Sequence, residues 1–154
     1  MVKRLKKFNF HDCIREGLLR NIPPSKGKAE RSIRAAEKWL KEAENGLKSG
    51  SFNSSLISSY LAMFHSARAI LFYDGIRERS HYCIARYLEE KYVKKRKLES
   101  KWVDLLDHYR DMRHNDQYDM DFFVTDDECK NALETAKRFA LRIKDLLEKI
   151  KLKS

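Results

Sequence analysis

Apolar residues recur every three or four positions through most of this chain, which is the period of an amphipathic α-helix. One apolar stripe is continuous over several turns between positions 25 and 50, and it consists of Ile33, Ala36, Leu40, Ala43 and Leu47. The segment after position 53 is apolar nearly all round, as expected of a helix at the centre of a core. We find no alternation of polar and apolar residues of the kind that marks an amphipathic strand. The pattern therefore predicts an all-α protein.

Capping residues and helix breakers divide this pattern into six expected helices. Ser25 and Ser80 are candidate N-caps, Gly75 ends the central helix, and Thr-Asp-Asp-Glu at 125–128 forms a capping box. The expected helices cover 10–19, 25–50, 53–74 and 80–95, and two more begin near 99 and 125. They predict an up-and-down bundle of four long helices plus short extra helices. We expect a single domain over 1–154, with residues 1–24 as an N-terminal helical extension.

The charge of the chain suggests a polyanionic partner, but its distribution restricts where that partner could bind. The net charge is +10, an excess that is typical of proteins that bind nucleic acid. Residues 102–134, however, carry 3 basic and 10 acidic side chains, a local net charge of −7. RNA would therefore be attracted first to the basic segments on either side of this acidic one.

The cysteines and the apolar segments indicate the cellular compartment of the protein. Cys13, Cys83 and Cys129 are odd in number, far apart and without CxxC spacing, so we expect neither a disulfide framework nor a thiolate metal site. This favours a reducing cytoplasm. The longest apolar run, 56–73, is interrupted by serines, a histidine and an arginine, which is typical of a buried helix and not of a membrane span. We expect a cytoplasmic protein with no membrane contact.

The stretch at 109–118, YRDMRHNDQY, holds the densest group of candidate catalytic residues. Arg110 and His114 are four residues apart and would share one helix face, with Tyr118 one turn later. Metal-independent RNA cleavage needs a base for the 2′-hydroxyl proton and cations that hold the phosphate. His114 is the candidate base, because an ordinary imidazole titrates near neutral pH. Arg110 and Arg113 are the candidate phosphate clamps.

The neighbouring aspartates allow two interpretations of this stretch. Asp111 could orient the His114 imidazole for catalysis. Alternatively, Asp107 and Asp111 flank Arg110, and the stretch is a solvated helix surface with ordinary charge pairs. The chain contains neither a phosphate-binding glycine loop nor an HExxH-like motif, so we expect no metal and no cofactor in either case.

Three further polar residues lie in apolar or capping contexts. His65 and Arg68 belong to the central apolar segment, where a histidine is most often a hydrogen-bonded core residue and an arginine needs a carboxylate partner. We expect that carboxylate to come from the acidic segment after position 99. His81 follows the Ser80 cap and is expected to be structural. All three remain secondary candidates for an orienting role.

The segment 59–71, SYLAMFHSARAIL, resembles the central-helix signature of HEPN domains, and in particular of a prokaryotic branch with the pattern YxAMFHxARAxL. Further features of that branch follow in order: Ser80-His81, then Arg113 five residues before Tyr118, then the capped last helix. The segment 13–19 near the N-terminus is also similar to that branch. The resemblance covers nearly the whole chain.

This resemblance implies an all-helical domain that usually forms a dimer. Many HEPN proteins are RNA-cutting toxins, commonly paired with a small nucleotidyltransferase antitoxin. Their signature is an arginine, four to six residues, then a histidine, often with a tyrosine two residues further on, and two protomers set these motifs in one cleft. In some pairs the antitoxin silences the toxin by adding AMP to that tyrosine.

The chain departs from this signature at the histidine. Arg110 and His114 are separated by only three residues, no histidine follows Arg113 at the required distance, and alignment on Tyr118 places Asp116 at the histidine position. Arg113 and Tyr118 therefore carry over by position, while Arg110 and His114 are imperfect substitutes.

These features together predict a HEPN-family homodimer in a toxin–antitoxin or defence module beside a nucleotidyltransferase. It would bind RNA or a nucleotide, with metal-independent ribonuclease activity as the candidate reaction. One alternative is a non-catalytic module that docks a partner protein through the acidic segment and the basic flanks. Another is a nucleotide-binding regulator in which Arg110 and Arg113 hold a phosphate.

Overall fold

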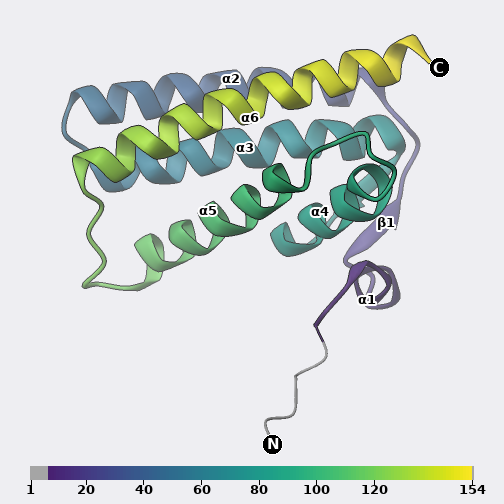
Figure 1. The fold of residues 1–154 in the computed structure, drawn as a ribbon, viewed down its shortest axis with the longest axis horizontal. Helices are drawn as coiled ribbons and strands as arrows, with labels where there is room; N and C mark the ends of the chain where they lie inside the picture. Colours follow the sequence, from purple (N-terminus) through teal and green to yellow (C-terminus); the bar gives the residue numbers. More distant parts are fainter. Residues whose placement is uncertain (1–6, 154) are drawn as a thin grey trace, which may run out of the picture.

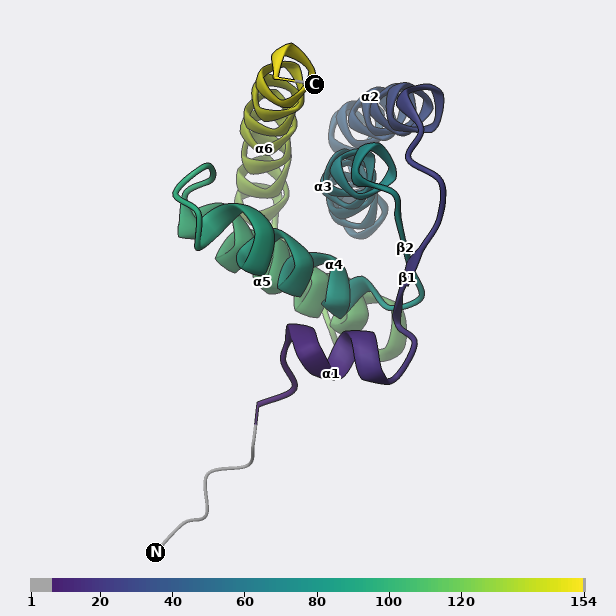
Figure 2. The ribbon, with the colours of Figure 1, turned by 90° about the vertical axis from the view of Figure 1, so that its right-hand side faces the viewer.

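The computed structural model describes residues 7–153. In chain order its elements are α1 (Phe10–Arg15), β1 (Leu19–Asn21), α2 (Lys26–Lys48), α3 (Phe52–Asp74), β2 (Ile76–Glu78), α4 (His81–Leu88), the π-helical turn η1 (Glu89–Val93), α5 (Ser100–Tyr118) and α6 (Asp126–Leu152). The helices α2, α3 and α6 run side by side along the molecule (Figure 1). Figure 2 shows α4 and α5 on one side of this layer and α1 beyond them. The predicted all-α bundle with four long helices, α2, α3, α5 and α6, is confirmed.

The central position of α3 follows from its composition. Leu56, Met63 and Ile70 are fully buried, and α3 packs against α2, α5 and α6. Burial of each such side chain contributes about 2 kcal/mol to folding. Despite this apolar character, no helix within residues 7–153 is both long enough and hydrophobic enough to cross a membrane.

The helix ends follow their capping residues with one exception. Ser25 Oγ accepts a hydrogen bond from the Lys28 amide at 3.0 Å, and Thr125 and Glu128 form the predicted capping box of α6. Gly75 ends α3 with φ +83°, and a Cβ there would lie 2.7 Å from the Ile22 carbonyl oxygen. Only glycine fits such a position without strain. Ser80 is the N-cap residue of α4 as expected, but its side chain makes no capping hydrogen bond.

A two-stranded antiparallel ribbon is the main addition to the predicted fold. Strands β1 and β2 pair with Leu19 opposite Glu78 and Asn21 opposite Ile76. The predicted first helix over 10–19 is therefore too long; it ends at Arg15, and Gly17 follows with φ +69°. Strands of three residues are too short for a recognisable alternation of polar and apolar residues, so the sequence pattern could not reveal them.

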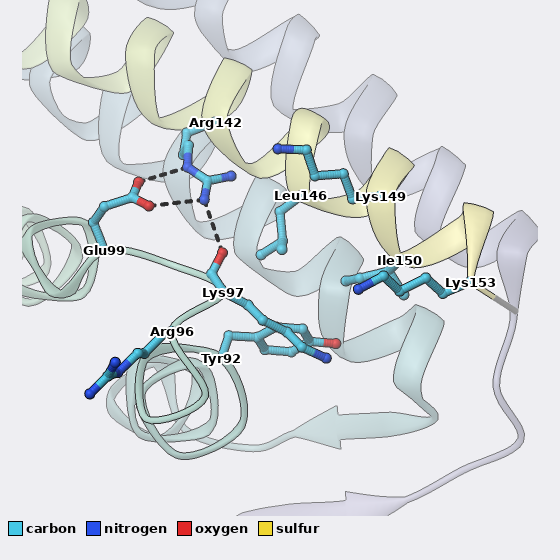
Figure 3. A pocket seen from close by; sticks show the side chains of 9 residues that line it. All are labelled: Tyr92, Arg96, Lys97, Glu99, Arg142, Leu146, Lys149, Ile150 and Lys153. Atoms are coloured by element: carbon cyan, nitrogen blue, oxygen red, sulfur yellow. Dashed lines mark hydrogen bonds and ion pairs between the residues drawn. The ribbon is translucent and has the colours of Figure 1, made fainter.

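The segment after α4 differs in detail from the expected helix over 80–95. The α-helix ends at Leu88 and continues as the single π turn η1, after which Arg96 takes φ +59° and the chain folds back. Arg142 on α6 holds this turn: it donates to both carboxylate oxygens of Glu99, at 2.7 and 3.0 Å, and to the Lys97 carbonyl oxygen at 2.9 Å (Figure 3). The basic run at 94–97 thus follows the helix end directly, where its charges complement the helix dipole.

A disulfide between Cys13 and Cys83 corrects the expectation that the cysteines stay unpaired. The two residues are 70 positions apart, both are fully buried, and their Cα atoms are 5.9 Å apart. The packing of α1 against α4 brings them together. Sequence spacing carries no information about this contact, because the pairing depends on how an N-terminal helix docks on a distant one. Cys129 remains a buried free thiol.

Candidate functional site

The predicted catalytic stripe lies on the C-terminal half of α5, and its residues differ in burial and in partners. Arg110 and Arg113 are half-buried against α3 and α4, whereas His114 is exposed and Tyr118 is 72% exposed. The rings of His114 and Tyr118 lie together with a centroid distance of 4.8 Å. No described contact joins Arg110 to His114: the arginines contact residues of α3, α4 and α5, whereas His114 contacts Tyr118.

Arg110 is engaged in ion pairs. Its Nη1 lies 2.5 Å from Asp107 Oδ1 and its Nη2 lies 3.3 Å from Asp111 Oδ1. Asp107 also pairs with Arg86 at 2.5 Å, and the Tyr82 ring lies near both guanidinium groups, at 5.0 Å from Arg110 and 4.5 Å from Arg86. Arg110 thus makes the expected charge pairs with Asp107 and Asp111, although its side chain is only 16% exposed. Asp111 contacts this arginine and not His114.

Arg113 belongs to a different cluster, which we call the Tyr60–His81–Arg113 cluster. The Arg113 guanidinium lies over the Tyr60 ring at 5.3 Å from its centroid, and its Nη1 donates to Gln117 Oε1 at 2.7 Å. The Tyr60 hydroxyl and His81 Nδ1 are hydrogen-bonded at 2.9 Å. His81 is half-buried and stacks on Phe64 at a centroid distance of 4.1 Å. A guanidinium, an imidazole and a phenol therefore do meet, but they come from α5, α4 and α3.

The surroundings of this cluster set its protonation at neutral pH. Burial lowers the pKa of His81 to about 4, and the positive charge of Arg113 acts in the same direction. Burial raises the pKa of Tyr60, an effect that Arg113 partly opposes. The imidazole is consequently uncharged and the phenol protonated at pH 7.

Asp116, which occupies the aligned position of the toxin histidine, faces the bundle. Its carboxylate accepts a hydrogen bond from the Asn53 side chain at the start of α3. Burial raises the pKa of Asp116, and this hydrogen bond partly opposes the shift. Asp116 thus joins the end of α5 to α3.

His65 and Arg68 lie on α3 beyond Phe64, outside the cluster. Arg68 pairs with Glu78 of β2, with Nε 2.6 Å from Oε1, so the expected partner from the acidic segment after position 99 is wrong. The short β2 strand, which the sequence pattern did not reveal, supplies this carboxylate. Burial, and next the charge of Arg68, lower the pKa of His65.

Two of the hollows on the described part of the molecule have four or more basic side chains in their lining. One, of about 520 Å³, lies between the turn after η1 and the C-terminal half of α6 (Figure 3). The other, of about 280 Å³, lies where α2, α3 and β2 meet, and His65 and Arg68 line it. Within residues 7–153 no three side chains of the histidine, cysteine, aspartate or glutamate type gather in a way that could hold a metal ion.

Sequence reasoning assigned minor roles to two members of the cluster. Tyr60 has the helical spacing of a core tyrosine and is indeed 1% exposed, and His81 was expected to be structural. Their hydrogen bond spans 21 residues of sequence, and Arg113 is still further along the chain. The HEPN-like features of the sequence did point to both residues. The pattern YxAMFHxARAxL includes Tyr60, and the Ser80-His81 pair is one of the features that follow it.

Comparison with known proteins agrees with this architecture. Residues 29–146 match the model of the HEPN domain. A UPF0332 protein of Pyrococcus horikoshii is 31% identical over 81 residues, a match that covers 53% of this chain and 57% of that protein. The aligned part thus spans little more than half of the relative. Because the domain model matches well over half of the chain, the protein belongs to the HEPN family.

Proposed function

We propose that this HEPN protein binds RNA and cleaves it without a metal ion, as a homodimer that works beside a nucleotidyltransferase in a toxin–antitoxin or defence module. The observation that carries the proposal is the Tyr60–His81–Arg113 cluster. It supplies an uncharged imidazole next to a guanidinium on a HEPN framework whose sequence lacks the usual histidine.

The chemistry of the cluster suits attack by a ribose 2′-hydroxyl on the adjacent phosphorus. In the tautomer in which His81 Nδ1 donates to the Tyr60 oxygen, Nε2 is free to accept the 2′-hydroxyl proton. Arg113 would stabilise the charge that builds up on the phosphate oxygens. The P–O5′ bond then breaks, leaving a 2′,3′-cyclic phosphate and a 5′-hydroxyl that takes up a proton. Exposed His114 is a candidate donor of that proton.

Tyr118 supports the proposed nucleotidyltransferase partner. It matches the tyrosine that some HEPN antitoxins modify with AMP, and its ring is 72% exposed. A partner enzyme could therefore reach its hydroxyl without unfolding α5. AMP addition at this site would place a bulky anion next to His114, which lies in ring contact with Tyr118.

Exposed apolar side chains beside the motif support a homodimer. Met120 is 96% exposed and Phe123 is 81% exposed, in the loop that follows α5. Neighbouring exposed apolar residues commonly mark an interaction surface. A second copy seated there would bring its own His114 and Tyr118 toward the first protomer.

The test is the cleavage of single-stranded RNA by purified protein in EDTA. His81→Ala and Arg113→Ala should each lower the rate about 100-fold or more, because each removes a base or a phosphate-stabilising charge. His108→Ala is the matched control, since His108 is an exposed histidine of α5 outside the cluster. No cleavage by the wild type, or full activity in both cluster variants, would reject the enzymatic proposal.

The alternative function is a non-catalytic module that docks a partner protein through α5. The engagement of Arg110 with Asp107 and the exposed Met120 and Phe123 favour it. In that case RNA affinity would depend little on salt, because few phosphates would be contacted. A nucleotidyltransferase would then be recovered in a pulldown with wild-type protein and lost with Phe123→Asp.

A further inference from the structure

The smaller basic hollow carries a set of cations that the proposed reaction does not use. It lies where α2, α3 and β2 meet and has a volume of about 280 Å³. Its lining includes Lys28, Arg31, His65, Arg68, Phe72 and Arg77. Four of these side chains are positively charged, and the lowered pKa of His65 leaves that imidazole mostly uncharged at pH 7.

Its arginines are arranged around one aromatic ring. The guanidinium groups of Arg68 and Arg77 lie 4.9 and 5.6 Å from the centroid of Phe72. One carboxylate, Glu78, serves both: it pairs with Arg68 at 2.6 Å and lies 4.0 Å from Arg77. Among the described residues no carboxylate pairs with Lys28 or Arg31, so the hollow keeps a net charge of about +3.

One aromatic ring connects this hollow with the Tyr60–His81–Arg113 cluster. Phe64 stacks on His81 at a centroid distance of 4.1 Å, and its ring also lies 5.5 Å from the Arg68 guanidinium and 5.0 Å from the His65 ring. Consecutive turns of α3 thus carry Tyr60, Phe64 and Arg68. An extended polyanion bound at the half-buried His81 would therefore meet half-buried His65 and Arg68 of the hollow nearby.

The larger hollow in Figure 3 lacks this arrangement. Its guanidinium from Arg142 is bound to Glu99 and to a backbone carbonyl, and its Tyr92 hydroxyl donates to Asp74. Its remaining cations are exposed side chains of the turn and of α6, such as Lys149. None of the described contacts joins its lining to His81.

We propose that the smaller hollow is a phosphate subsite that holds the RNA backbone next to the bond cleaved at the Tyr60–His81–Arg113 cluster. This inference rests on the proposed function and names a substrate contact for it. Arg31 and Arg77, which are exposed, would bind one phosphate group through their guanidinium forks. Arg68 also lines the hollow and adds its positive charge while it remains paired with Glu78.

The test is the equilibrium affinity for a fluorescent single-stranded RNA of about 16 nucleotides, a length in the range of single-strand binding sites. All its riboses are 2′-O-methylated, so that it cannot be cleaved by 2′-hydroxyl attack. Arg31→Glu and Arg77→Glu are compared with Lys149→Glu in the larger hollow and with Lys38→Glu, an exposed residue of α2. All four variants carry the same change of charge on an exposed residue, which separates a local contact from a general loss of positive charge.

The expected result is a loss of affinity of about tenfold in Arg31→Glu and Arg77→Glu, and less than about twofold in the two controls. The slope of log affinity against log salt should also become shallower by about 0.7 for each lost phosphate contact. Equal losses in all four variants, or no loss in any, would overturn the subsite. Failure of the ribonuclease proposal would look different: ordinary RNA would stay intact with wild-type protein, while the affinity differences persisted.

Discussion

At the scale of single residues, the environment of His81 matters more than its place in the sequence. Five histidines are present, and the one with the most suggestive spacing, His114, is exposed and contacts only the Tyr118 ring among the described interactions. His81 instead is hydrogen-bonded to Tyr60, stacked on Phe64 and close to Arg113. Spacing along one helix could not reveal this, because the three partners of His81 lie on other helices.

The lowered pKa of His81 predicts a loss of stability in mild acid. The unfolded chain takes up a proton near pH 6.5, whereas the folded protein does so only near pH 4. Between these values the unfolded state binds more protons, so the free energy of unfolding should fall as pH falls from 6.5 to 4. His65, whose pKa is also lowered, adds to the same trend.

Urea unfolding of the wild type and of His81→Gln across this pH range measures the effect. The substitution should flatten the pH dependence, while His108→Gln should leave it unchanged. If the free energy of unfolding changed with pH in the same way in wild type and His81→Gln, His81 would not have the lowered pKa that follows from its burial near Arg113.

At the scale of elements, apolar periodicity and capping residues were sufficient to predict the long helices but not the segments that connect them. The ranges of α2, α3 and α6 follow from their stripes, from Ser25 and Gly75, and from the capping box of Thr125. The β1–β2 ribbon and the docking of α1 depend on contacts between distant segments, which leave no periodic trace. The carboxylate partner of Arg68 was missed for the same reason.

Two of the predicted N-caps, Thr125 and Ser80, should differ in their contribution to stability. Thr125 accepts a hydrogen bond from the Glu128 amide at 3.1 Å, whereas the Ser80 side chain makes no capping bond. Thr125→Ala should therefore lower the free energy of unfolding by about 1 kcal/mol, and Ser80→Ala by much less. Urea titrations at neutral pH measure both; equal losses would contradict the assigned caps.

The Cys13–Cys83 disulfide should stabilise the fold strongly under oxidising conditions. It closes a loop of 70 residues, which in the chain-entropy model corresponds to about 4 kcal/mol. The free energy of unfolding should drop by this order when dithiothreitol is added. The double variant Cys13→Ser/Cys83→Ser serves as the control and should not respond to the reductant. If dithiothreitol left the unfolding midpoint of the wild type unchanged, the disulfide would not form in solution.

At the scale of the whole molecule, negative and positive charge lie in different places. The acidic segment 102–134 includes α5 and its motif, whereas cations gather on α2, β2 and the end of α6. The net charge of +10 indicated nucleic acid from the sequence, but only the fold places a basic hollow one aromatic ring away from His81. The HEPN resemblance anticipated the bundle correctly, whereas the residues of the proposed catalytic cluster are not the ones that the linear motif singled out.

The exposed apolar loop predicts the interface of the proposed homodimer. Phe123→Asp should convert the wild-type dimer into an 18.3 kDa monomer, because a charge would have to be desolvated in the interface. Leu141→Asp is the control, since Leu141 is 69% exposed on α6. Light scattering after gel filtration gives the masses. A wild-type monomer, or a dimer that persists in Phe123→Asp, would exclude this interface.

The central claim is that His81, and not His114, is the base that works with Arg113. The most direct measurement is kcat/KM for cleavage of single-stranded RNA in EDTA as a function of pH, since this ratio reports the pKa of the base in the free enzyme. We predict that activity stays high below pH 6 and falls only as pH approaches about 4, the pKa of the buried His81 imidazole. An acid limb near pH 6.5 that disappears in His114→Ala, with His81→Ala still active, would contradict the account.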